Sequence, residues 1–282
     1  MVQRIFKTTM KESINNGGIA FTVVMLLQLI RYFLIAGGAY LLFYVWKRRA
    51  WFHQKIQQKF PKNTEIYREI AYSFSTMLIF GAVAYCIFLA RRAGYTQLYQ
   101  DVSDYGWAYL IFTFVILILI HDTWFYWTHR MMHHPKLFPI FHKVHHLSHN
   151  PSPWAAFAFH PTEAVVEAGF FPIAVLLFPV HGYAVAAFML YMMVLNVLGH
   201  VGFELFPSGF TKHWLGKWFN TSTHHNMHHR YGRGNYGLYF NFWDRLMGTN
   251  HKLYDATFEE VVNRSATESV SVEQASSQSL AS

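Results

Sequence analysis

The chain has 282 residues, of which 53% are hydrophobic and 19% aromatic, whereas only 13% are charged, about half the usual share in globular proteins. This composition excludes a disordered chain and a coiled coil, and it disfavours a simple soluble domain. The formal net charge of +8 accompanies long apolar runs, which indicates a membrane surface and not nucleic acid as a partner. One cysteine, Cys86, leaves no internal disulfide framework and no cysteine-based zinc site.

Three apolar runs are predicted to span a membrane: residues 19–44, 70–90 and 107–120. Because a helix needs roughly 20 apolar residues to cross a bilayer, the first two runs qualify outright. The third qualifies if His121 and Asp122 lie near the membrane interface, where the aromatic residues that follow also belong. The first run begins late and is too long for a signal peptide, so we expect no cleavable leader.

A fourth apolar region, residues 169–199, is interrupted by Pro179, His181 and Gly182. Such breakers predict a helical hairpin that enters and leaves the membrane on one side. The alternative is a pair of helices buried in a protein core.

The basic residues predict the orientation. The loop between the first two spans carries far more basic than acidic residues: Lys47, Arg48, Arg49, Lys55, Lys59, Lys62 and Arg68 against Glu65 and Glu69. Basic loops tend to stay on the cytoplasmic side. Three crossings then return the chain to that side at His121, so we expect the histidines that follow to face the cytoplasm.

The predicted fold is therefore an all-α integral membrane protein with about four membrane helices or helical hairpins and a cytoplasmic histidine-rich cap. Residues 1–106 hold the N-terminal membrane helices and the basic loop, and residues 107–262 hold the histidine-rich region with its hairpin. Residues 263–282 are rich in Ser, Gln and Glu and are expected to be a disordered tail.

Nearly all of the 18 histidines lie between His121 and His251, and three clusters have the spacing of metal ligands. The clusters read HRMMHH, HKVHH and HHNMHH. On a helix, residues at i, i+3 and i+4 share one face. This places together His129 with His133, His142 with His145 and His146, and His225 with His228 and His229. Eight imidazoles exceed what one ion can use, which suggests two metals.

Imidazole suits zinc, copper, iron and nickel. The alternative to metal binding is a histidine cluster that senses pH, and such a cluster would not need the repeated spacing. His200, at the end of the hairpin, is a further ligand candidate, with Asn196 one helical turn before it. His160 precedes a typical helix start, which favours a structural role.

The other polar residues near the clusters carry weaker expectations. His121 and Asp122 either orient a ligand through a hydrogen bond or mark the interface. Three histidines adjoin the clusters and are expected to support them from outside: His134, His149 and His224. The remaining four look incidental: His53, His181, His213 and His251.

The three clusters resemble the histidine boxes of the fatty acid hydroxylase/sterol desaturase superfamily of membrane di-iron enzymes. The strings HDTWFYWTHR, AFHPTE, GFELFP and NFWDRLMGT extend the resemblance over residues 122–249. The sterol C5-desaturase-like branch is the most similar. The resemblance implies a membrane bundle capped by a cytoplasmic site for two metals, with nine histidine ligands: His129, His133, His142, His145, His146, His200, His225, His228 and His229. Some relatives have another histidine where this chain has Asn196.

The resemblance also implies the chemistry. Oxidation of an unactivated C–H bond needs a redox metal and O2, so two iron ions are expected. The histidine boxes leave hydroxylation and desaturation both open, as well as a sterol, fatty acyl or sphingoid lipid substrate. A single cysteine holds no iron–sulfur cluster, so electrons must come from a separate carrier of the cytochrome b5 or ferredoxin type. The expected location is the endoplasmic reticulum in a eukaryote or the inner membrane in a bacterium.

Two other classes of function compete with this hypothesis. A non-catalytic metal-binding or metal-transport protein would need ionisable residues along its spans, and only Arg31 and Glu167 are candidates. A zinc hydrolase would use three protein ligands at its metal, which leaves most of the histidines unexplained.

Overall fold

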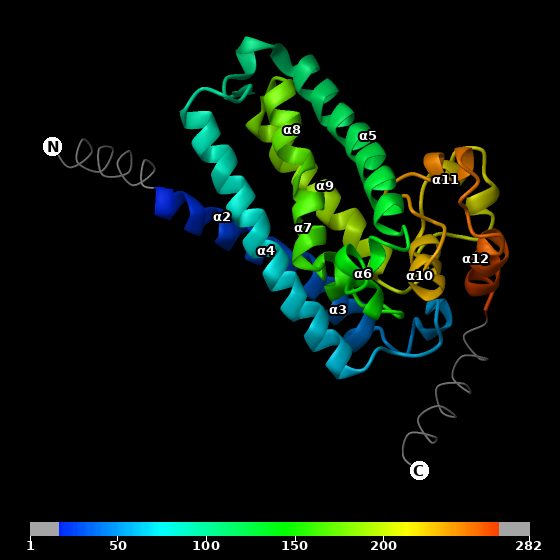
Figure 1. The fold of residues 1–282 in the computed structure, drawn as a ribbon. Coiled ribbons are helices and arrows are strands. Elements are labelled where there is room, and N and C mark those ends of the chain that lie inside the picture. The colour runs from blue at the N-terminus through cyan, green and yellow to red at the C-terminus, as the bar shows by residue number, and fades with distance from the viewer. Residues whose placement is uncertain (1–16, 265–282) are drawn as a thin grey trace.

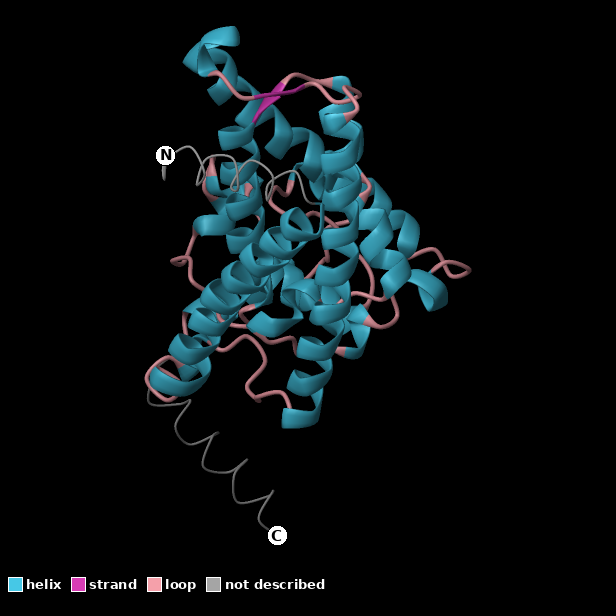
Figure 2. Ribbon diagram, turned by 90° about the vertical axis from the view of Figure 1, so that its left-hand side faces the viewer, coloured by secondary structure: helices cyan, strands magenta, loops and turns pink. Residues whose placement is uncertain are grey.

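The computed structural model describes residues 17–264, and helices make up most of this part of the chain (Figures 1 and 2). Four of the described helices are long and apolar enough to cross a membrane: Gly17–Trp46, Asn63–Arg92, Gly106–Met132 and Gly182–His200. Side chains such as Leu27 and Leu34, which are 61% and 70% exposed, give these helices an outward apolar surface suited to lipid. The predicted all-α membrane fold is therefore confirmed. The predicted tail, apart from Asn263 and Arg264, lies outside the described residues.

The first span is one continuous helical rod with π-helical turns in its second half. It comprises α2 (Gly17–Tyr32), η1 (Phe33–Gly37), α3 (Gly38–Tyr40) and η2 (Leu41–Trp46). The second span is α4 (Asn63–Arg92), which begins where the Lys62 amide donates to Glu65 Oε2 at 2.8 Å. That bond satisfies a backbone donor next to the helix start. Basic residues in the last turn and Gly94, with φ of +79°, end the helix.

The third span, α5 (Gly106–Met132), continues well beyond the predicted apolar run. His121 and Asp122 lie inside the protein, with 4% and 3% of their surfaces exposed, so they do not mark an exposed interface. Tyr239 supplies their partners: its hydroxyl lies 3.0 Å from His121 Nδ1, and its amide donates to Asp122 Oδ1 at 2.8 Å. Because these polar groups are hydrogen-bonded within the protein, the helix continues through them.

The predicted hairpin, residues 169–199, corresponds to α8 (Phe170–Leu177) and α9 (Gly182–His200), and α7 (Pro161–Ala168) precedes it. At its tip, β2 (Val180–His181) pairs in parallel with β1 (Leu98–Tyr99), in the loop between α4 and α5 (Figure 2). His181 begins α9, since its Nδ1 accepts a hydrogen bond from the Tyr183 amide. Leu177 and Tyr183 are exposed, which argues against a pair of buried core helices.

Short elements gather at the other end of the bundle and form the cap. They are η3 (Phe52–Gln54), α6 (Phe138–Phe141), η5 (His145–Leu147), η6 (Pro153–Phe157), η7 (Phe210–Lys212), η8 (Gly216–Trp218), α10 (Ser222–Tyr231), α11 (Phe242–Leu246) and α12 (Tyr254–Val262). A further turn, η4 (Val102–Asp104), precedes α5. The loop between the first two spans lies against the cap, because the Ile56 amide donates to Gly202 O at 3.0 Å. The basic loop and the histidine clusters thus share one end of the bundle. The side of the membrane that this end faces, and the domain boundaries, stay predictions.

The core joins the cap to the spans. Trp154, in η6, packs among residues of α2 and α4. Its carbonyl accepts hydrogen bonds from Tyr32 Oη at 2.8 Å and Ser73 Oγ at 3.0 Å. The segment between the second histidine cluster and α7 is consequently hydrogen-bonded to two membrane helices, which fixes its position beside the site.

Candidate metal centre

Two groups of buried histidines lie at the junction of the bundle and the cap. The first group contains His129, His133, His142, His146 and His228, and the second contains His145, His200, His225 and His229. Within each group, one ring nitrogen from every residue lies within 4.8 Å of those of the others. All nine histidines that were named as ligand candidates from the sequence are therefore brought together, in two groups.

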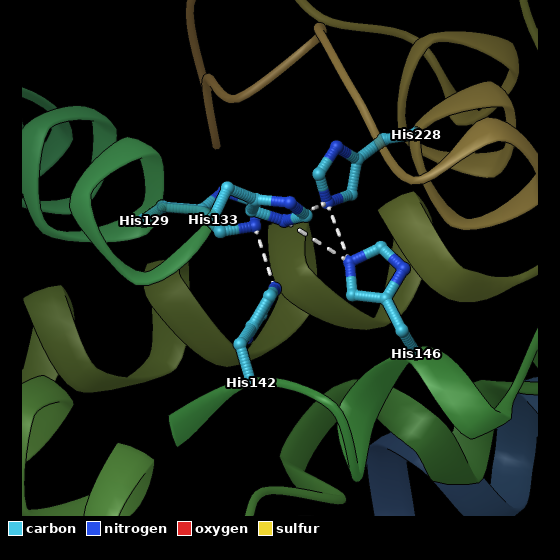
Figure 3. A group of neighbouring side chains, drawn as sticks. All are labelled: His129, His133, His142, His146 and His228. Carbon is cyan, nitrogen blue, oxygen red and sulfur yellow. Dashed lines mark hydrogen bonds between the residues drawn. The ribbon is translucent and has the colours of Figure 1, made fainter. Parts of the chain in front are cut away.

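The Nε2 atoms face inward in both groups. In the first group, His129 Nε2 lies 2.9 Å from His142 Nε2, and His146 Nε2 lies 3.0 Å from His228 Nε2 (Figure 3). In the second, His225 Nε2 and His229 Nε2 lie 3.0 and 3.2 Å from His200 Nε2.

The Nδ1 atoms of five of these histidines face outward to hydrogen-bond acceptors. His129, His145, His200 and His228 meet the carbonyl oxygens of Tyr236, Ala158, Asn196 and Gly234, and His142 meets a carboxylate oxygen of Glu163. Carbonyl and carboxylate oxygens only accept, so each Nδ1 carries the proton and each Nε2 presents a lone pair. Lone pairs aimed at one another repel unless a cation lies among them. This donor set therefore fits a metal ion in each group.

The electrostatics of the site keep the imidazoles neutral. Burial lowers the pKa of His133 to about 2 and that of His228 to about 4. Burial, together with the neighbouring imidazoles, also holds the pKa well below its usual value for the others in the cap: His142, His145, His146, His225 and His229. A histidine must be neutral to ligate a metal, so all of these are ready to bind one at physiological pH.

Helix α10 delivers three of the nine imidazoles. Its first turn is fixed because Thr221 Oγ1 accepts from the His224 amide at 3.3 Å and Glu204 Oε2 accepts from the Thr223 amide at 2.9 Å. A buried carboxylate at this position also interacts favourably with the helix dipole. The helix ends at Gly232, whose φ of +69° is a left-handed conformation that favours glycine.

Asp244 organises the loop that accepts hydrogen bonds from His129 and His228. Its carboxylate accepts from the amides of Tyr236 at 3.0 Å and Gly237 at 2.7 Å, and His224 Nε2 lies 3.4 Å away. Burial alone would raise the pKa of Asp244, but these hydrogen bonds and His224 hold it at about 2. The His224 side chain therefore faces Asp244 of α11, and His224 belongs to neither metal group.

The other residues singled out in the sequence take different positions. Asn196 Nδ2 donates to Ala156 O at 2.7 Å, and its own carbonyl holds His200. His160 begins α7, accepting from the Thr162 amide, as its structural interpretation expected. His134 and His149 are exposed and belong to neither group. His121 and Asp122 anchor Tyr239, as described above.

Sequence reasoning missed three buried carboxylates that support the site: Glu163, Glu204 and Asp244. Each lies in one of the strings that flank the histidine clusters, respectively AFHPTE, GFELFP and NFWDRLMGT. An acidic residue inside an otherwise apolar or aromatic string was the available signal, because such a residue is rarely buried without a partner.

Comparisons with known proteins agree with this geometry. A family model for fatty acid hydroxylase matches residues 114–249, which include all nine histidines. A Delta(7)-sterol 5(6)-desaturase of Gibberella zeae is 32% identical over 208 residues, covering 74% of this chain and 61% of that protein. One from Aspergillus fumigatus is 33% identical, covering 74% of this chain and 68% of its own length. The chain belongs to the fatty acid hydroxylase/sterol desaturase superfamily.

Within this superfamily, the sterol C5-desaturase-like branch is supported by an animal relative as well. The lathosterol oxidase of Rattus norvegicus is 30% identical over 219 residues, covering 75% of this chain and 71% of that protein. The chain spans less than two thirds of the length of the Gibberella zeae relative. No solved structure matches the chain.

Proposed function

We propose that the protein is an O2-dependent membrane oxidoreductase that uses two iron ions to hydroxylate or desaturate a lipid. The observation that carries this proposal is the inward convergence of nine Nε2 atoms in two groups, with five Nδ1 atoms tied to acceptors. The names of the relatives favour a sterol as the substrate, and a fatty acyl or sphingoid lipid is the wider class.

Each group would hold one iron ion. The first would be held by His129, His133, His142, His146 and His228, and the second by His145, His200, His225 and His229. Iron, unlike zinc, changes its oxidation state and so supplies the reduction of O2 that C–H oxidation requires. The chain itself orients the imidazoles, keeps them neutral and, by burying them, excludes bulk water.

Hydroxylation and desaturation use the two oxygen atoms of O2 differently. In both, one O2 takes up two electrons and two protons from outside the lipid. Hydroxylation inserts one oxygen atom into a C–H bond and releases one water, whereas desaturation removes two hydrogen atoms from the lipid and releases two waters. We propose that a separate cytochrome b5 or ferredoxin type of carrier supplies the electrons, because the single cysteine of the chain holds no cluster.

We place the site on the cytoplasmic side of the membrane, in the endoplasmic reticulum of a eukaryote or the inner membrane of a bacterium. The support is the basic loop between the first two spans, which lies against the cap.

Lipid profiling by mass spectrometry under heavy-isotope O2 tests the function. Cells expressing the intact chain are compared with cells expressing His145→Ala and with a matched His149→Ala control, since His149 is exposed and outside both groups. A lipid that gains one labelled oxygen with the intact chain and the control, and not with His145→Ala, establishes a hydroxylase. A lipid that loses two hydrogens without label establishes a desaturase. Identical lipids in all three cultures, with the protein present and loaded with iron, would refute the proposal.

A further inference from the structure

The cap carries a group of large apolar side chains on its surface, none of them in the two metal groups. We call it the α11 patch, and it consists of Trp214, Leu215, Trp218, Phe242, Leu246 and Met247. Trp214 is 72% exposed and Leu246 is 63% exposed. Clustered large apolar residues at the surface mark a contact with another apolar phase or molecule, whereas single ones do not.

The α11 patch is one surface, although its residues come from two stretches of chain. The Asn241 amide donates to Trp218 O at 2.8 Å, and Arg245 Nε donates to Lys217 O at 2.8 Å. The rings of Trp218 and Phe242 lie 6.3 Å apart. The turns around η7 and η8 are thus fixed to α11, and the exposed side chains project from a common platform.

This platform lies against a membrane helix. Trp243 of α11 donates from Nε1 to Thr123 Oγ1 of α5 at 3.1 Å, and its ring lies 5.6 Å from that of Trp127. Figure 1 shows α11 beside the half of α5 that is nearer the cap. Since Trp127 and Leu119 of α5 are themselves exposed, the patch continues the outward apolar surface of a membrane span.

The charges around the patch suit lipid headgroups. Residues 205–220 contain no Asp or Glu, and the one acidic residue in residues 238–253, Asp244, is buried. Lys212 is exposed, and Lys217 Nζ lies 5.1 Å from the centre of the Trp218 ring. One carboxylate from another element, Glu259 of α12, accepts hydrogen bonds from Ser208 and Gly209 at the start of this segment. Tryptophan beside lysine is typical of protein surfaces at the boundary between lipid chains and headgroups.

We propose that the α11 patch is a membrane-interface anchor, inserted among the headgroups and upper acyl chains of the leaflet that the cap faces, with its lysines against anionic headgroups. The cap then contacts the bilayer directly, at a second place besides the ends of its spans. This inference goes beyond the proposed function and does not depend on it.

Nitroxide labelling of the full chain in vesicles of equal parts phosphatidylcholine and phosphatidylserine tests the anchor. The exposed Cys86 is replaced by Ser, and one cysteine is introduced as Leu246→Cys or Trp214→Cys. Leu119→Cys on α5 serves as the lipid reference and Ala256→Cys on α12 as the water reference, since all four positions are exposed. Collision of each label with O2, which concentrates in lipid, is compared with collision with a water-soluble nickel chelate.

We expect the labels at Leu246 and Trp214 to resemble the label at Leu119, with an O2-to-chelate ratio several-fold above that at Ala256. A ratio equal to that at Ala256 would place the patch in water and overturn the proposal. Low collision with both reagents would mean that protein covers the patch, from a second copy or an electron carrier, and would overturn it too. Either labelled position alone suffices if the other variant does not fold.

Discussion

His142 Nδ1 lies 2.6 Å from Glu163 Oε1, and both side chains are buried. This carboxylate fixes the proton of His142 on Nδ1, and therefore leaves Nε2 free for a metal. The hydrogen bond from His142 Nδ1 offsets part of the cost of burying the carboxylate. One acidic residue on α7 thus sets the ligand atom of a histidine from the second cluster.

Replacement of Glu163 tests whether its hydrogen bond to His142 strengthens metal binding. We expect Glu163→Ala to weaken iron binding by about 10- to 100-fold, the usual cost of losing the outer partner of a ligating histidine. Glu163→Gln keeps an acceptor oxygen and should retain more iron. Iron per chain after dialysis against graded chelator measures the effect. Glu260→Gln, on the exposed side of α12, is the control, and equal iron retention by Glu163→Ala and this control would refute the role.

The separation into two groups predicts that ligand variants lose metal by group. His133→Ala should lower iron from about two ions per chain to about one, and so should His225→Ala, because each residue lies in a different group. The double variant should retain neither ion. Elemental analysis of the purified protein decides this. His134→Ala is the matched control beside His133, and full iron content in both ligand variants would contradict the grouping.

The spans were predictable because a bilayer imposes a local requirement on length and apolarity. Eight of the nine histidines were predictable for a similar reason, since helical spacing brings neighbours in the sequence to one face, whereas His200 was assigned from the family resemblance. Even the pairs follow this rule: His129 with His133, and His225 with His229, are four residues apart and share a group. The second cluster departs from the expected helix, because it lies in a turn and the short η5.

The division of the second and third clusters between the two groups was not predicted, because spacing alone placed His145 with its neighbours in the second cluster and His228 with those in the third. His145 and His228 each lie one residue before a histidine of the other group. Such a choice depends on tertiary packing. The extension of α5 past His121 was missed for the same reason, because its partner Tyr239 lies 118 positions away in the chain.

Replacement of Asn196 tests whether its side-chain amide is a structural hydrogen-bond donor or a metal ligand. Its Nδ2 donates to Ala156 O, so Asn196→Ala should lower the free energy of unfolding by about 1 kcal/mol, the typical value of one hydrogen bond. The carbonyl of residue 196 still accepts from His200, so both iron ions should remain. Thermal unfolding and iron content of the same preparation give the two readouts. Loss of one ion in Asn196→Ala would instead make the side chain a ligand.

The burial of Lys55 should make the free energy of unfolding depend on pH. It lies in the loop between the first two spans, where its Nζ lies 3.3 Å from both Asn150 Oδ1 and Gly202 O. Burial lowers its pKa from 10.5 to about 7, with Lys59 adding to the shift and Glu69 opposing it. Between these two values the unfolded chain binds a proton that the folded protein does not, so stability must rise with pH.

We therefore expect the protein in detergent to gain about 2 kcal/mol of stability from this lysine between pH 7 and pH 9. In Lys55→Met the side chain cannot titrate, so that part of the slope should disappear. Lys59→Met, at an exposed position, should keep most of it, because burial is the larger cause of the shift. Thermal unfolding at several pH values measures the slope. Equal slopes in Lys55→Met and Lys59→Met would mean that Lys55 stays protonated in the folded protein, held by the rings of Tyr44, Phe60 and Phe203, whose centres lie 5.3 to 5.7 Å from its Nζ.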